Sequence, residues 1–204
     1  YKEIGSITGN FLNNRSDENG GAVFNDANKS IGHVTGDFIG NSAQKSGGAI
    51  YTMSNMNFAS GSGTHFMSGN YTEDSRGKIY NAVYTKPTAA ITMTFDTTGG
   101  GAWVINDNME NGNYVFKGND TIDAATGTTT QYIAINNDIV NVKDLKVENT
   151  TLKFGAYQHE DQSAKNRDGK GAFVASLYAD GTANYNADAV TSLSLNNAVF
   201  DIAN

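Results

Sequence analysis

The sequence predicts an all-β fold, specifically a parallel β-helix in which the chain winds repeatedly around one axis. Two observations predict it: short alternating strands separated by turn residues, and a repeat with a constant step. Segments such as 91–95 and 102–106 alternate between apolar and polar side chains, and helical periodicity is weak throughout. The 204 residues include 23 glycines and one proline, a composition typical of ordered, turn-rich β structure.

The clearest repeat lies at the start of the chain. It consists of an aromatic residue, an asparagine three positions later and a Gly-Gly-Ala-aliphatic tetrad, and one constant step without a gap relates its two copies. The first copy is Phe11, Asn14, Gly20, Gly21, Ala22 and Val23, and the second is Phe38, Asn41, Gly47, Gly48, Ala49 and Ile50. A repeat of this length fits one turn of a solenoid, whose strands pair at about 4.8 Å.

Each part of the repeat has an expected structural role. The phenylalanines should stack inside the coil, where burial of each ring contributes about 1.5–3 kcal/mol. The asparagines should lie at a turn and hydrogen-bond to one another along a column. The glycines should form a corner at positive φ, and the aliphatic residue should begin the next strand. On this interpretation the motif is scaffold.

Weaker repeats continue along the chain. A degraded third copy is expected to contain Phe58 and Phe66, with Gly77 near the place of its missing tetrad. The segment starting at Leu145 aligns with the one starting at Leu193, and this longer step is interpreted as two turns. We therefore expect about eight turns in one continuous solenoid: a motif-rich part at 1–84 and a less regular part at 85–204, with a polar loop near 155–190.

Composition excludes several classes of function. The net charge of −7 and pI near 4.8 argue against a nucleic-acid-binding surface. Cysteine is absent and only three histidines occur, which excludes disulfides and Cys-based zinc sites. No stretch is long and apolar enough for a membrane-spanning helix, so membrane insertion is not expected. Both ends of the sequence look as though they continue in a longer chain.

The motif resembles the repeats of the chlamydial polymorphic membrane proteins, which also occur in related autotransporter passengers. The resemblance rests on the paired FxxN and GGA[ILV] tetrapeptides, here Phe11 to Asn14 with Gly20 to Val23 and Phe38 to Asn41 with Gly47 to Ile50. It implies a right-handed β-helix on the bacterial surface, attached to the outer membrane or secreted after cleavage. It also implies a role in adhesion, to which these tetrapeptides have been linked.

The expected partners are a host cell-surface protein, a matrix component or a glycan, with self-association as a further possibility. Nucleic acid is not an expected partner. The protein is not expected to be an enzyme, and no catalytic residue, cofactor or metal is expected. Two alternatives stay open: a carbohydrate-active β-helix enzyme (a lyase or glycosidase), and an inert structural stalk of a larger adhesin.

One polar loop is the candidate interaction site, because functional contacts concentrate in such excursions. Its residues are Tyr157, His159, Glu160, Asp161, Lys165, Arg167 and Asp168. His33 and His65 lie in different repeats, far from His159, and are not expected to bind metal. Trp103, the only tryptophan, is expected in the core rather than as a platform for a sugar.

Overall fold

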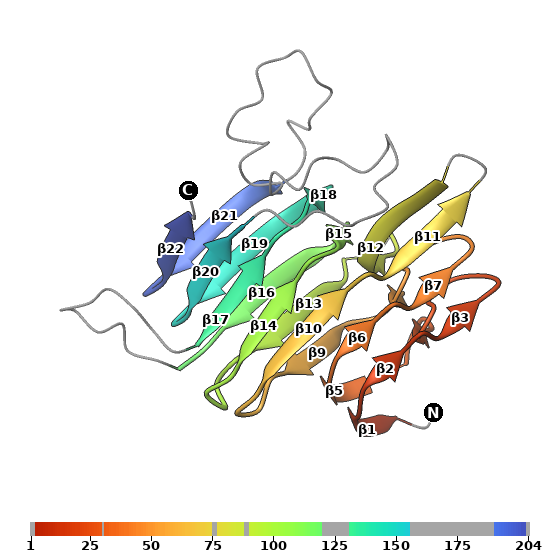
Figure 1. The fold of residues 1–204 in the computed structure, drawn as a ribbon. Helices are drawn as coiled ribbons and strands as arrows, with labels where there is room; N and C mark the ends of the chain where they lie inside the picture. Colours follow the sequence, from red (N-terminus) through yellow and green to blue (C-terminus); the bar gives the residue numbers. More distant parts are fainter. Residues whose placement is uncertain are drawn as a thin grey trace, which may run out of the picture.

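The computed structural model describes residues 3–29, 31–74, 77–87, 90–119, 131–155 and 190–202, which consist of strands and turns without a helix. Most strands belong to two long sheets, each seven strands deep. Figure 1 shows them stacked like rungs, with the first strands at one end of the molecule and the last strands at the other. The all-β parallel β-helix predicted from the sequence is confirmed.

The first sheet receives one strand from every turn in the described part of the chain, and all its neighbouring strands pair in parallel. Its strands, in both spatial and sequence order, are β1 (Ile4–Thr8), β5 (Ile31–Thr35), β9 (Met56–Ala59), β13 (Thr92–Asp96), β16 (Asn113–Lys117), β19 (Val142–Glu148) and β21 (Val190–Asn196).

The second sheet is built in the same way from the strand that follows in each turn. Its strands are β2 (Phe11–Leu12), β6 (Phe38–Ile39), β10 (Thr64–Ser68), β14 (Ala102–Ile105), β17 (Tyr132–Ile135), β20 (Thr151–Phe154) and β22 (Val199–Ile202). The constant order of strands means that each turn lies directly on the previous one.

The remaining strands form the third side of the coil. They are β3 (Arg15–Ser16), β4 (Val23–Asn25), β7 (Ser42–Ala43), β8 (Ile50–Thr52), β11 (Tyr71–Asp74), β12 (Gly77–Thr85), β15 (Asn108–Glu110) and β18 (Ile139–Val140). They pair in parallel except for β11 and β12, which form an antiparallel pair in the third turn.

The core consists of columns of side chains, because every second residue of a strand points its side chain inward. One column runs through the first sheet, from Ile7 and Val34 through aromatic rings to Val147 and Leu195. Its central members Phe58, Phe95 and Phe116 are fully buried. Because a solenoid buries apolar side chains between successive turns, every turn contributes the same positions to the core.

The length of a turn varies far more than the sequence repeat indicates. The length of a turn is the number of residues between paired positions on neighbouring strands of the first sheet. The shortest such step runs from Met93 to Tyr114, and the longest, from Leu145 to Leu193, is more than twice as long. This longest step spans one turn, since β19 pairs directly with β21. Our interpretation of it as two turns is therefore wrong, although the predicted alignment of Leu145 with Leu193 is the observed register.

The third copy of the motif is also displaced from its expected position. Met67, not Phe58 or Phe66, continues the column of Phe11 and Phe38, and Val83 pairs with Ile50. The third tetrad is thus Tyr80 to Val83, and Gly77 does not take part in it. The described residues contain seven turns, and the predicted total of about eight stays a prediction.

Candidate interaction surface

The repeated phenylalanines lie inside the coil, stacked on one another. Phe11 in β2 pairs with Phe38 in β6, and their ring centroids are 4.4 Å apart with an angle of 6° between the planes. Met67 of β10 pairs with Phe38 from the other side, and the Phe38 side chain is fully buried. The phenylalanine of the motif is therefore a core residue.

The repeated asparagines form a ladder of amides that runs in one direction. The Nδ2 of Asn14 donates to the Oδ1 of Asn41 at 2.9 Å, and the Nδ2 of Asn41 donates to the Oδ1 of Asn70 at 2.8 Å. Each Oδ1 also accepts a backbone N–H from the preceding turn, at 3.0 and 3.1 Å. Asn41 and Asn70 are fully buried, so the ladder satisfies polar groups that would be costly to leave unpaired.

The ladder ends on a carboxylate. The Oδ2 of Asp107 accepts the Nδ2 of Asn70 at 2.7 Å and its backbone N–H at 2.9 Å, while Oδ1 accepts the backbone N–H of Gly69 at 2.9 Å. An ionised carboxylate only accepts hydrogen bonds, whereas an amide both donates and accepts. Asp107 is therefore a chemically suited last member of a column in which every hydrogen bond between side chains runs toward the C-terminal end.

The two glycines of the tetrad serve different purposes. Gly20 and Gly47 have φ values of 66° and 67°, a conformation that favours glycine. Gly48 has no such φ, but a Cβ there would lie 2.3 Å from the backbone N of Tyr71 and 2.6 Å from the carbonyl oxygen of Asn81. The corner thus needs one glycine for its turn and the other for close approach between backbones.

The residue after each tetrad faces away from the core and is aromatic in all three turns. Phe24, Tyr51 and Tyr84 pair in register across β4, β8 and β12. Their rings stack with centroids 5.5 and 5.6 Å apart and interplanar angles of 3° and 10°. Phe24 is 52 % exposed, and the two tyrosines are partly exposed. We refer to these three residues as the aromatic ladder.

Sequence reasoning missed the aromatic ladder, although its signal is present. Phe24 and Tyr51 are related by the same step as the two copies of the motif. The motif residues themselves are mostly buried, whereas the positions of the aromatic ladder are exposed or partly exposed. Burial raises the pKa of Tyr84, and the nearby charge of Glu110 raises it further, so its hydroxyl stays protonated at neutral pH.

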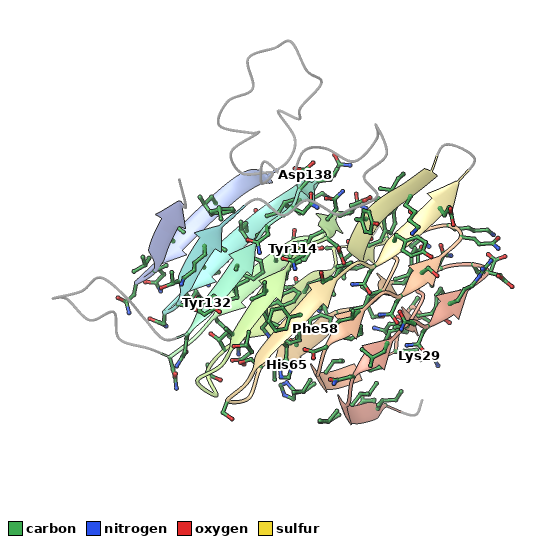
Figure 2. The ribbon with its side chains drawn as sticks, in the orientation of Figure 1. Lys29, Phe58, His65, Tyr114, Tyr132 and Asp138 are labelled. Atoms are coloured by element: carbon green, nitrogen blue, oxygen red, sulfur yellow. The ribbon has the colours of Figure 1, made fainter. Side chains whose placement is uncertain are left out.

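The candidate loop from Tyr157 to Asp168 lies outside the described residues. The other residues singled out in the sequence lie within the coil or at its surface. Trp103 is fully buried, which confirms its place in the core. Its ring lies 5.3 Å from that of His65, whose Nδ1 is 3.3 Å from the Oδ1 of Asp37. Figure 2 shows His65 near one edge of the coil and Phe58 further inside.

The described part of the chain contains neither a metal-binding cluster nor a membrane-spanning helix. Histidine, aspartate and glutamate side chains do not gather there in a group of three or more that could hold a metal ion. No helix long and apolar enough to cross a membrane is present among the same residues.

Comparison with known proteins gives one result that bears on identity. Residues 8–26 and 36–53 match the family model of the Chlamydia polymorphic membrane protein (PMP) repeat. Neither the curated proteins nor the solved structures gave a match to the chain. The two matched segments contain both copies of the FxxN and GGA[ILV] motifs whose columns are described above. The chain therefore carries two segments that match the polymorphic membrane protein repeat.

Proposed function

We propose that the protein is a non-catalytic adhesive module of an autotransporter passenger, exposed on the bacterial surface or released from it. In this proposal it binds a host cell-surface protein, a matrix component or a glycan, and the aromatic ladder is the contact surface. The candidate loop at Tyr157 to Asp168 is a second place for contacts.

The observation that carries the proposal is the exposed aromatic ladder beside two PMP repeats. Aromatic side chains are enriched in binding surfaces because they bury a large area at low cost in conformational entropy. A partly exposed phenylalanine in a strand, stacked on the tyrosine of the next turn, contributes little to the core on the other side of the sheet. The buried motif columns hold these rings at fixed spacing, so their contribution to binding is indirect.

The test distinguishes side chains that contact a partner from side chains that only support the fold. The double variant Phe24→Ser/Tyr51→Ser removes two rings of the ladder, and Phe66→Ser removes an exposed phenylalanine on the second sheet as the matched control. Binding of the purified proteins to cultured epithelial cells is measured as a function of concentration. We expect the double variant to bind about tenfold more weakly and the control to be unchanged, with both retaining the circular dichroism spectrum of the parent chain.

The alternatives predict different results. An inert stalk would show no saturable binding to cells even with the ladder intact. A carbohydrate-active enzyme would release reducing or unsaturated products from a panel of polysaccharides. Equal loss of binding in the double variant and the control would show that the ladder is not the contact surface.

A further inference from the structure

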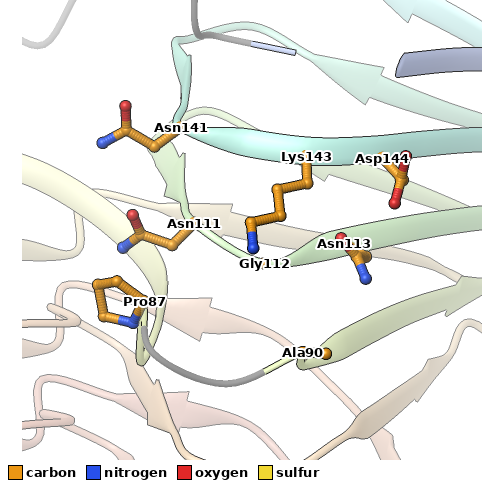
Figure 3. Close-up of a pocket in the computed structure, with 8 residues that line it drawn as sticks. All are labelled: Pro87, Ala90, Asn111, Gly112, Asn113, Asn141, Lys143 and Asp144. Carbon is orange, nitrogen blue, oxygen red and sulfur yellow. The ribbon is translucent and has the colours of Figure 1, made fainter. Parts of the chain in front are cut away.

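A pocket of about 420 Å³ lies at a corner of the coil, remote in sequence from the motif residues. Three successive turns contribute to it where the chain passes from the third side to the first sheet. Its walls are Pro87, Ala90, Asn111, Gly112, Asn113, Asn141, Lys143 and Asp144. Figure 3 shows the Lys143 side chain extending from its strand toward the turn at Gly112, with Pro87 and Ala90 on the opposite side.

The floor of the pocket is held rigidly by the turns of the coil. Asn111 and Asn141 have φ values of 62° and 55° in equivalent turns of successive coils. The Nδ2 of Asn111 donates to the carbonyl oxygen of Thr85 at 3.1 Å, and the side chain is 6 % exposed. A Cβ at Gly112 would lie 2.6 Å from the Oγ1 of Thr85, so this turn has no room for a larger residue.

Several polar groups in the pocket wall have unused bonding capacity. The Oδ1 of Asn113 is buried and has no hydrogen-bond partner within the described residues. Over the same part of the chain, the side chains of Lys143 and Asp144 form no ion pair or hydrogen bond. The Asn113 oxygen is enclosed, so the bonding capacity that a ligand can reach is that of the exposed Lys143 and Asp144 side chains.

We propose that this pocket binds a single carboxylate-bearing sugar residue at the end of a glycan. The Lys143 ammonium supplies a cation for the carboxylate, and Asn113, Asn141 and Asp144 supply acceptors and amide donors for hydroxyl groups. The ring of Pro87 and the methyl of Ala90 offer an apolar surface to the face of the sugar. The volume falls in the range of small-ligand sites and matches a ligand of one or two rings.

The charge distribution favours one acidic sugar over an extended polyanion. The whole chain has a net charge of −7, which repels a highly sulfated or polyuronic chain at long range. Asp144 lies beside Lys143 in the pocket, so only one cation is available and a second negative group on the ligand would be repelled. A ligand with a single negative charge is repelled least at long range and can be paired by the one ammonium group.

The test measures binding of free sugars to the whole chain, without cells. Glucuronic acid and N-acetylneuraminic acid are titrated against the ¹⁵N-labelled protein, with glucose as the neutral comparison. We expect the acidic sugars to shift resonances of Asn111, Gly112 and Asn113, and the shifts to weaken with added salt. Lys143→Gln should lower the affinity for the acidic sugars about tenfold and remove the preference over glucose.

Two further variants isolate the role of charge. Lys146→Gln is the matched control, because Lys146 is an exposed lysine on the same strand whose Nζ lies 2.7 Å from the Oε1 of Glu148. It should bind as the parent chain does. Asp144→Asn keeps an acceptor oxygen but removes the competing negative charge, and should raise the affinity for the acidic sugars about twofold to threefold.

The proposal is overturned if neither acidic sugar shifts the pocket resonances, or if Lys143→Gln and Lys146→Gln bind equally. It is also overturned if glucose binds as tightly as glucuronic acid. Because the assay uses free sugars, these outcomes leave the adhesion proposal standing. Conversely, a chain that binds acidic sugars but not cells would retain the pocket and lose the adhesive role.

Discussion

At the scale of single residues, the fold depends on buried polar side chains as well as on apolar ones. The amide ladder is polarised, because each asparagine side chain donates to the side chain of the next turn toward the C-terminal end. The Nδ2 groups of Asn41 and Asn70 also donate to backbone carbonyls of the turn before. The last residue of such a column must accept hydrogen bonds from the donors that face it and must not place a donor of its own against them. Asp107 fulfils that condition with both carboxylate oxygens.

The first prediction concerns this last position. Asp107→Asn would place an NH₂ group opposite N–H donors that both carboxylate oxygens now accept, leaving at least one buried donor unpaired. We expect a loss of about 1–3 kcal/mol in the free energy of unfolding, measured by urea titration. Asn41→Asp reverses the defect, since its new oxygen would face the acceptors of Asn70 and Phe11, and should also destabilise. An unchanged free energy of unfolding in Asp107→Asn would contradict the assigned direction of the ladder.

The second prediction concerns a buried hydroxyl group. Tyr114 is 1 % exposed, and its hydroxyl has no hydrogen-bond partner among the residues that the structure describes. Burial, with a further contribution from Glu110, raises the pKa of Tyr114 well above its ordinary value, so the group is a neutral phenol. Tyr114→Phe keeps the ring and removes the unpaired group, so we expect unchanged stability or a gain of about 1–2 kcal/mol. A clear loss of stability in thermal unfolding would show that the hydroxyl has a partner.

At the scale of elements, the strands and turns show what the sequence determines. Stacking of Phe11 on Phe38 and pairing of Asn14 with Asn41 follow from a repeat with no insertion between its copies. The alignment of Leu145 with Leu193 gives the correct register, because inward-facing positions must match between adjacent turns. It does not give the number of turns, because β19 pairs directly with β21 across a sequence step more than twice as long as the shortest one.

The displaced third tetrad has a local cause. In the third turn the chain returns through the antiparallel pair of β11 and β12. In the first two turns the corresponding segment is a loop. Asn81 occupies the place that corresponds to Gly48, two positions before Val83, and its backbone N–H donates to the carbonyl oxygen of Asn70 at 2.8 Å. The glycine signature is lost there because the backbone takes a different route. The aromatic ladder persists, since Tyr84 still follows the aliphatic residue.

The third prediction tests the close approach at the glycine corner. Gly48→Ala would place a Cβ within 2.8 Å of three backbone atoms of the neighbouring turn, which cannot move as a flexible side chain could. We expect a loss of about 3 kcal/mol or more in unfolding free energy. Gly5→Ala is the matched control, because a Cβ at this strand position meets nothing within 4 Å. Similar midpoints for the two variants in urea would contradict the packing described for the corner.

At the scale of the whole molecule, each turn contacts the turns beside it. The first and second sheets keep the order of the sequence from one end to the other, and Figure 1 shows the turns following one another along the axis. Stability in such an array is close to a sum of the contributions of single turns and of the interfaces between neighbours. A defect in one turn should therefore weaken its neighbours more than distant turns.

The last prediction follows from this one-dimensional arrangement. Phe38→Ala empties a fully buried position in the second turn, and the lost contacts with Phe11 and Met67 belong to the turns on either side. We expect the free energy of unfolding to fall by about 3–5 kcal/mol, and the N-terminal turns to open locally before the rest. Hydrogen exchange followed by mass spectrometry should show lost protection in β2, β6 and β10, while β17 and β20 exchange as in the parent chain. The mirror-image variant Leu152→Ala, in the penultimate turn of the second sheet, should reverse this distribution. Uniform loss of protection along the molecule in both variants would mean that the coil unfolds as one cooperative unit, because the interfaces between turns are then stronger than the turns they join.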